Sequence, residues 1–165
     1  MLDGKLFRGV DGVHPEIGHH VIDPSGPACT CGACGCWESL ASGSAMERWF
    51  RENASAEDLN ACEICSRTDP LAKAAVTRTG RYMGLGLANL ITLFTPEMIA
   101  LGGGLMRSRD LFWRQIQESI QSNCGYVPRE KVRIVPAALG DDVGIIGAAC
   151  AWALRHRSNE YGQPA

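Results

Sequence analysis

Apolar residues recur with a helical period in several stretches of this chain, and short apolar runs mark the places of strands. The predicted helices cover residues 39–49, 70–94, 110–122 and 145–154. The run over 98–101 predicts a buried parallel strand, and a second strand is expected over 132–136. This succession of helices and short strands indicates an α/β domain.

The long predicted helix has a clear start and an unusual interior. Asp69 is suited to cap it, and Pro70 suits the first helical position. Three glycines inside the helix, at positions 80, 84 and 86, each cost roughly 1 kcal/mol relative to alanine. Close packing against a neighbouring helix would offset that cost.

The first residues predict a hairpin with an incomplete partner. Asp3-Gly4 is a two-residue turn signal, and residues 5–8 form a short candidate strand after it. Only Met1 and Leu2 precede the turn, whereas strands usually need about five residues. We therefore expect the sequence to start in the middle of a sheet.

Composition narrows the function classes. A chain of 165 residues with 45% hydrophobic residues suffices for one domain or one large lobe. The net charge of −2 gives no electrostatic signal for nucleic acid. No apolar run approaches the about 18 residues of a membrane span, and no signal peptide is recognisable. We expect no nucleic-acid partner, no membrane partner and a reducing cytoplasmic location, where clustered cysteines favour metal over disulfides.

The densest candidate chemistry lies between residues 16 and 38. His19 with Cys29, Cys31 and Cys36 offers one imidazole and three thiolates, a donor set that suits a tetrahedral structural zinc. Two alternatives stay open at this stage. Cys34 can form a ligand pair or redox pair with Cys31, and His20 can replace His19 as a ligand.

The same segment holds two carboxylates that such a zinc would fix in place. Glu16 precedes His19 by three residues, and Glu38 follows Cys36 by two. Ionised carboxylates accept hydrogen bonds, and sugar hydroxyls donate and accept them. Glu16, Glu38 and the free ring nitrogen of His19 therefore suit a polyol ligand, although Glu38 alone would ordinarily be a helix-capping or solvated residue.

The pattern E-I-G-H, nine residues, then C-x-C-G-x-x-G-C-x-E resembles the ROK family of repressors, open reading frames and sugar kinases. The resemblance implies a zinc held by His19, Cys29, Cys31 and Cys36. It also implies that Glu16, His19 and Glu38 bind a hexose or N-acyl-hexosamine. The implied fold is of the actin/hexokinase-like (ribonuclease H-like) ATPase type, with an inserted zinc-binding loop.

The resemblance runs from near Leu2 to about Leu154 and covers the C-terminal half or so of the usual family protein. Residues 1–165 are therefore expected to be the C-terminal sugar- and zinc-binding lobe. The family's N-terminal lobe supplies a D-x-G-x-T phosphate loop and an Asn-Asp pair whose aspartate acts as base on the sugar hydroxyl, and neither motif occurs in this sequence. The implied activity is glucokinase-like transfer from ATP with Mg²⁺, by an incomplete half of the enzyme. A repressor-type sugar sensor and an inactive truncated product are the alternatives, and the family is often oligomeric.

Two further motifs carry weaker signals. Gly102-Gly103-Gly104 directly follows the strand predicted over 98–101, and in ROK kinases the matching loop packs near the adenosine. A tight strand-to-helix turn is the structural alternative for these glycines. Cys62 and Cys65 match the spacing of a metal pair but have no second pair nearby, which favours chance or core thiols.

Overall fold

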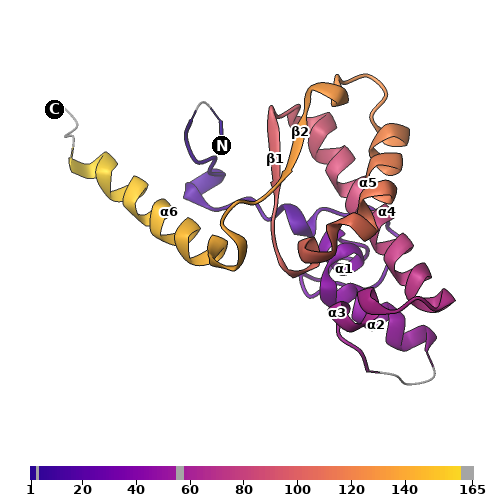
Figure 1. Ribbon diagram of the computed structural model, residues 1–165. Helices are drawn as coiled ribbons and strands as arrows, with labels where there is room; N and C mark the ends of the chain where they lie inside the picture. The colour runs from indigo at the N-terminus through magenta and orange to yellow at the C-terminus, as the bar shows by residue number, and fades with distance from the viewer. Residues whose placement is uncertain (3, 55–57, 161–165) are drawn as a thin grey trace.

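The computed structural model describes residues 1–2, 4–54 and 58–160, and Figure 1 shows their arrangement. Eight helices and strands position the site. In chain order they are α1 (Trp37–Ala41), α2 (Gly43–Asn53), α3 (Ala61–Ser66), α4 (Pro70–Phe94), β1 (Met98–Leu101), α5 (Arg109–Asn123), β2 (Arg133–Pro136) and α6 (Val143–Glu160). Short 3-10 helices at Ile17–His19 and Gly104–Ser108 matter for the site below.

Helix α4 is the centre of the packed body, and it begins as the sequence predicts. The side chain of Asp69 accepts hydrogen bonds from the backbone N–H groups of Leu71 and Ala72, both at 3.1 Å. Its glycines allow close approach to neighbouring elements. A Cβ at Gly84 would lie 2.6 Å from the carbonyl oxygen of Ile116 in α5, so the two helices touch there backbone to backbone. The prediction of helix–helix contact is confirmed at this glycine.

The two strands form a parallel pair in which Met98 lies beside Arg133 and Leu101 beside Pro136. The parallel arrangement is confirmed, but the expected burial of the first strand is wrong. Ile99 packs against the core formed by the helices, whereas Met98 is 50% exposed on the opposite face. One face of the sheet is covered by helices, and within the described residues the other face is open.

The helix expected over 39–49 is divided into α1 and α2. Ser42 between them has extended backbone angles, and its hydroxyl accepts a hydrogen bond from the N–H of Ala45 at 3.1 Å. Serine is more favourable at a helix start than inside a helix, because its hydroxyl can accept a hydrogen bond from a backbone N–H that has no partner within the helix. Helix α1 is therefore short, and its first turn carries Trp37 and Glu38.

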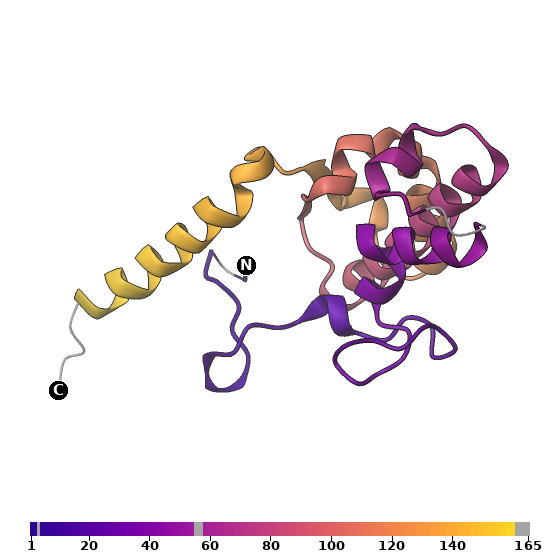
Figure 2. The same cartoon turned by 90° about the horizontal axis from the view of Figure 1, so that it is seen from below.

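The two ends of the chain lie outside the packed body. Helix α6 extends away from the other helices in both views (Figures 1 and 2), and its Ile145 is 77% exposed. Leu2 and Lys5 form an antiparallel bridge around the expected turn, of which Asp3 lies outside the described residues. The strand expected over residues 5–8 is wrong, because among the described residues only Leu2 pairs with this stretch. Across the described part of the chain, none of the helices combines the length and apolarity that a membrane crossing requires.

Candidate metal centre and adjoining cavities

The loop between His19 and Trp37 folds back on itself through backbone contacts. Antiparallel bridges join Val21 to Cys36 and Ala28 to Cys34. Gly35 adopts a positive φ of 70°, and a Cβ at this position would lie 1.5 Å from the carbonyl oxygen of Asp23. Only glycine fits there. This tight return brings residues from both ends of the loop to one point.

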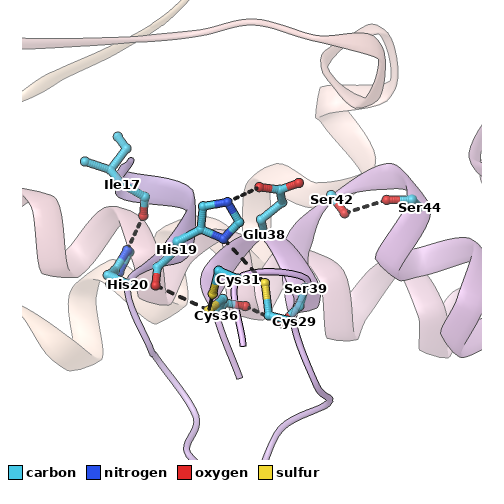
Figure 3. A network of polar contacts seen from close by, with 10 residues as sticks. All are labelled: Ile17, His19, His20, Cys29, Cys31, Cys36, Glu38, Ser39, Ser42 and Ser44. Carbon is cyan, nitrogen blue, oxygen red and sulfur yellow. Dashed lines mark hydrogen bonds and ion pairs between the residues drawn. The ribbon is translucent and has the colours of Figure 1, made fainter. Parts of the chain in front are cut away.

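Four potential ligand atoms meet at that point, one each from His19, Cys29, Cys31 and Cys36, and all lie within 4.8 Å of one another. His19 Nδ1 lies 3.4 Å from the sulfur of Cys29, and the sulfurs of Cys31 and Cys36 lie 3.5 Å apart (Figure 3). In a tetrahedral site with zinc–sulfur bonds of about 2.3 Å, neighbouring ligand atoms are separated by roughly 3.5–3.8 Å. The spacing and the donor set therefore fit a four-coordinate zinc.

The thiols of this cluster differ in acidity. The pKa of Cys29 is lowered to about 6, chiefly because the backbone N–H of Cys31 donates a hydrogen bond to its sulfur. Burial raises the pKa of the Cys36 thiol to about 12. A buried thiolate needs a neighbouring positive charge, and a divalent cation at the centre of the cluster would supply it.

The two alternatives from the sequence, Cys34 and His20, lie outside this group of four. Cys34 is exposed. The His20 ring donates through Nδ1 to the carbonyl oxygen of Ile17 and packs edge-on against Trp37, with 5.5 Å between ring centroids. His20 Nε2 is buried without a hydrogen-bond partner in the described structure. His20 therefore supports the fold of the loop from the side of Trp37.

The second nitrogen of His19 points toward a carboxylate. His19 Nε2 lies 3.6 Å from Glu38 Oε2, on the side of the ring opposite to the sulfurs (Figure 3). Glu38 is 59% exposed at its side chain, and a Cβ at Gly18 would lie 3.2 Å from its carboxylate. A metal bound at Nδ1 would fix the ring and leave Nε2 and the carboxylate available to one ligand. Glu16 is exposed at the start of the 3-10 helix that carries His19.

Glu38 lines one of two neighbouring cavities. This cavity, of about 230 Å³, has a lining that includes Gly18, Trp37, Glu38, Leu87 and Gly102. The second, of about 500 Å³, is lined by Gly102, Gly103 and Gly104 together with residues of α2 and α3. The two cavities lie next to each other, because five residues line both: Ala41, Ser42, Met83, Gly102 and Met106. Glu38 and Gly102 thus line the same cavity, Gly103 and Gly104 line its neighbour, and Glu16 is not among the residues described along either.

Sequence analysis missed the side chains that anchor this arrangement to α4. Trp37 donates through Nε1 to the carbonyl oxygen of Tyr82 at 3.0 Å, and a Cβ at Gly86 would lie 2.1 Å from the Trp37 ring. The Tyr82 hydroxyl donates to Asp23 Oδ2 at 2.9 Å. The one signal for these contacts was the cost of Gly86 inside a helix, which predicts a close neighbour but does not identify it.

The sequence is similar to known sugar kinases and repressors. The ROK family model matches residues 1–155. A glucokinase from Streptomyces coelicolor is 32% identical, over 90% of this chain and 53% of the relative. A xylose repressor from Bacillus spizizenii is 29% identical, over 89% of this chain and 38% of the repressor. The chain therefore spans about half the length of the glucokinase it matches.

Solved structures agree with the sequence comparison. A ROK hexokinase from Thermus thermophilus is 34% identical and matches 89% of this chain and 51% of its own, with a TM-score of 0.79. A ROK glucokinase from Streptomyces griseus, solved with glucose and AMPPNP, is 30% identical and matches 89% of this chain and 54% of its own, with a TM-score of 0.76. The chain shares the mixed α/β architecture of these actin/hexokinase-like kinases, and it belongs to the ROK family.

Proposed function

We propose that this chain is the sugar- and zinc-binding lobe of a glucokinase-like ROK enzyme, which transfers the γ-phosphoryl group of ATP to a hydroxyl of a hexose or N-acyl-hexosamine. The observation that carries this proposal is the meeting of two cavities at Gly102. One cavity is lined by a carboxylate beside an imidazole, and the wall of the other includes the three consecutive glycines of the turn after β1. That pairing suits a sugar next to a nucleotide.

The smaller cavity offers the chemistry of a sugar site. The Glu38 carboxylate can accept hydrogen bonds from sugar hydroxyls. His19 Nε2 lies 3.6 Å from this carboxylate, so it can hydrogen-bond to the same sugar. Trp37 and Leu87 supply apolar walls for the ring carbons. Glu16, at the start of the 3-10 helix that carries His19, completes the proposed set from the exposed side.

The proposed zinc is structural. His19, Cys29, Cys31 and Cys36 provide four protein ligands, which leave no open coordination position for water or substrate. Its chemical contribution is to fix the loop and to neutralise the clustered thiolates. His19 then belongs to both sites, because one ring nitrogen faces the sulfurs and the other faces Glu38.

The larger cavity suits the nucleotide. A Cβ at Gly103 or Gly104 would meet no atom within 4 Å, so the backbone at these positions borders open space. A ligand can approach such a backbone closely. We assign ATP, with its Mg²⁺, to this cavity, with the adenosine against the glycine turn.

The transfer step needs groups that this sequence does not show. Phosphoryl transfer depends on positioning, on charge neutralisation by Mg²⁺ and on an aspartate that accepts the hydroxyl proton. The 165 residues contain no D-x-G-x-T phosphate loop. We therefore assign sugar and nucleotide binding to this chain, and the proton-accepting aspartate to residues outside it.

The test is glucose binding by the zinc-loaded chain, measured by calorimetry beside the metal content of the same sample. Glu38→Gln should weaken glucose binding about ten- to hundredfold, since a hydrogen bond to a charged group is worth about 1.5–3 kcal/mol. Its zinc content should not change, because Glu38 is not among the four ligand atoms. Glu118→Gln is the matched control, on the exposed side of α5 beside Arg114.

Two results would contradict the proposal. Equal glucose affinity in the Glu38 and Glu118 variants would remove the carboxylate from the sugar site. Zinc loss in Glu38→Gln would overturn the division between metal loop and sugar ligand. ATP consumption by the purified chain with a hexose panel is expected to be absent, and turnover would place the catalytic aspartate within these residues.

A second candidate is a non-enzymatic sugar sensor, favoured by the similarity to a xylose repressor. A sensor and a kinase lobe share the sugar site and differ in the nucleotide cavity. Binding of AMPPNP, measured with and without glucose, separates them, because only the kinase assignment requires it. The absence of a nucleic-acid partner stays a prediction from the net charge.

A further inference from the structure

The geometry points to a second cysteine site: Cys62 and Cys65 form a thiol–disulfide exchange pair in the wall of the larger cavity, and this pair takes small disulfides as its reactants. Both residues line the cavity of about 500 Å³ that also contains Gly102, Gly103 and Gly104. They lie three residues apart in α3, on one side of the helix. Neither belongs to the proposed metal cluster.

The two thiols differ in the way that an exchange pair requires. Cys62 is exposed, whereas Cys65 is half-buried and packs against the core. Burial raises the pKa of the Cys65 thiol, and the Ser108 side chain hydrogen-bonds to it. The exposed sulfur of Cys62 therefore meets an incoming disulfide first, and Cys65 stands behind it as the resolving thiol.

The exchange balances in two steps. The Cys62 thiolate attacks one sulfur of a small disulfide, forms a mixed disulfide and releases one small thiolate. The Cys65 thiolate then attacks the Cys62 sulfur, forms the Cys62–Cys65 bond and releases the second small thiolate, and the released thiolates take up the two cysteine protons. The protein loses two hydrogens and two electrons, and the small disulfide is reduced to two thiols.

Closing this bond must move the first turn of α3. Residues three apart in a helix have Cβ atoms about 5–6 Å apart, whereas a disulfide needs about 3.5–4.5 Å. The turn that must tighten contains the capping box of Asn60 and Glu63, and Ala61 donates its N–H to Glu47 of α2 at 2.8 Å. Asn60, Ala61 and Glu47 all line the cavity, so oxidation reshapes its wall.

The test is peptide mapping of the zinc-loaded chain after incubation with oxidised glutathione. We expect a Cys62–Cys65 disulfide in the unaltered chain and a stable glutathione adduct on Cys62 in Cys65→Ser. The adduct should persist at least about tenfold longer in that variant, because a neighbouring thiol acts at an effective concentration of about millimolar or higher. Cys62→Ser should form neither product at Cys65.

Cys150→Ser is the matched control, since Cys150 is an exposed cysteine on α6 that does not line the cavity. Its Cys62–Cys65 chemistry should equal that of the unaltered chain. The proposal is overturned if Cys62 of the unaltered chain carries glutathione as persistently as in Cys65→Ser, or if Cys62 stays reduced while Cys150 reacts.

The consequence for nucleotide binding rests on the proposed function, and a separate measurement addresses it. AMPPNP should slow alkylation of Cys62 by iodoacetamide and leave Cys150 unaffected. An absence of protection would contradict the nucleotide assignment of the cavity. The exchange pair does not depend on that assignment, because the disulfide mapping alone supports or overturns it.

Discussion

The loop over residues 20–36 and the helical body around α4 are held together by different forces. The loop buries little side-chain surface, and its shape rests on backbone bridges, a glycine that admits no side chain and four converging ligand atoms. The body is held by apolar packing between α4, α5 and the inner face of the sheet. We therefore expect the loop to depend on the proposed zinc, whereas the body depends on its apolar core.

Glu38 lies at the junction of these two regions. Cys36, two residues earlier, is the last of the four proposed ligands, and Trp37 between them packs against Gly86 of α4. The carboxylate is thus fixed from the loop on one side and from the body on the other. A substitution that destabilises either region should therefore weaken sugar binding at Glu38. The two kinds of substitution should differ in their effects on protein stability and on metal content.

Zinc removal is expected to have the largest effect and to separate the regions most clearly. A chelator should accelerate amide exchange in residues 20–36 at least about a hundredfold, or about 3 kcal/mol. That is modest beside the about 10–16 kcal/mol that zinc contributes in zinc-finger peptides. Protection in α4 and α5 should persist, as hydrogen-exchange mass spectrometry would report.

Cys29→Ser should reproduce the effect of the chelator, and Cys150→Ser should keep both the metal and the protected loop. Exchange that rises equally in the loop and in α4 would show that the two regions unfold as one unit. A loop that stays protected in metal-free protein would show that its backbone bridges suffice.

Two glycines of α4 provide the next test, because they face different neighbours. Alanine at either should lower the free energy of unfolding by about 1–3 kcal/mol in urea denaturation, as extra methyl groups do in packed interiors. Gly86→Ala pushes on Trp37, so it should also weaken glucose binding about tenfold, or about 1.4 kcal/mol. Gly84→Ala pushes on Ile116 and should leave glucose binding within about twofold.

The outcome that contradicts this distinction is equal loss of glucose binding in both variants at equal zinc content. Any displacement of α4 would then weaken glucose binding, whether or not it acts through Trp37. Gly84→Ala therefore serves as the matched control for Gly86→Ala.

The same contrast explains what the sequence predicts and what it does not. The sequence predicts helix α4 over residues 70–94 with Asp69 as its cap, because capping, proline placement and helical period are local signals. The four candidate ligands lie within 18 positions of one another, and the structure brings them together; their role as zinc ligands stays a prediction. The loop between these ligands turns at Gly32 and Gly35, so their convergence also depends on nearby sequence.

The contacts that sequence analysis missed join distant segments. Trp37 contacts Tyr82 across 45 positions, and Tyr82 reaches Asp23 across 59. Such contacts depend on how α4 packs, which a local pattern does not specify. The open face of the sheet was missed for a related reason, because a short apolar run predicts a strand but not which faces are covered.

The smallest expected effect concerns acid, which weakens both regions for different reasons. Protons compete with a metal for His19 and the thiolates, so the loop should lose the proposed zinc as the pH falls. In the body, hydrogen bonds from Arg67 and from the N–H groups of Leu71 and Ala72 lower the pKa of Asp69. A lowered folded-state pKa means that this carboxylate stabilises the protein fully above its ordinary pKa of about 3.9 and loses that contribution as the pH falls through the folded value.

Asp69→Asn isolates the share of the body in this acid sensitivity. Asparagine also caps helices, so stability at neutral pH should change little, while the loss of stability below about pH 4 should become shallower. Urea denaturation of metal-free protein across this range measures the change without interference from zinc. Asp58→Asn, which alters an exposed ion pair with Arg51 at a residue that does not cap a helix, is the control. If stability below about pH 4 falls as steeply in Asp69→Asn as in the unaltered chain, the acid sensitivity of the body arises elsewhere than at the start of α4.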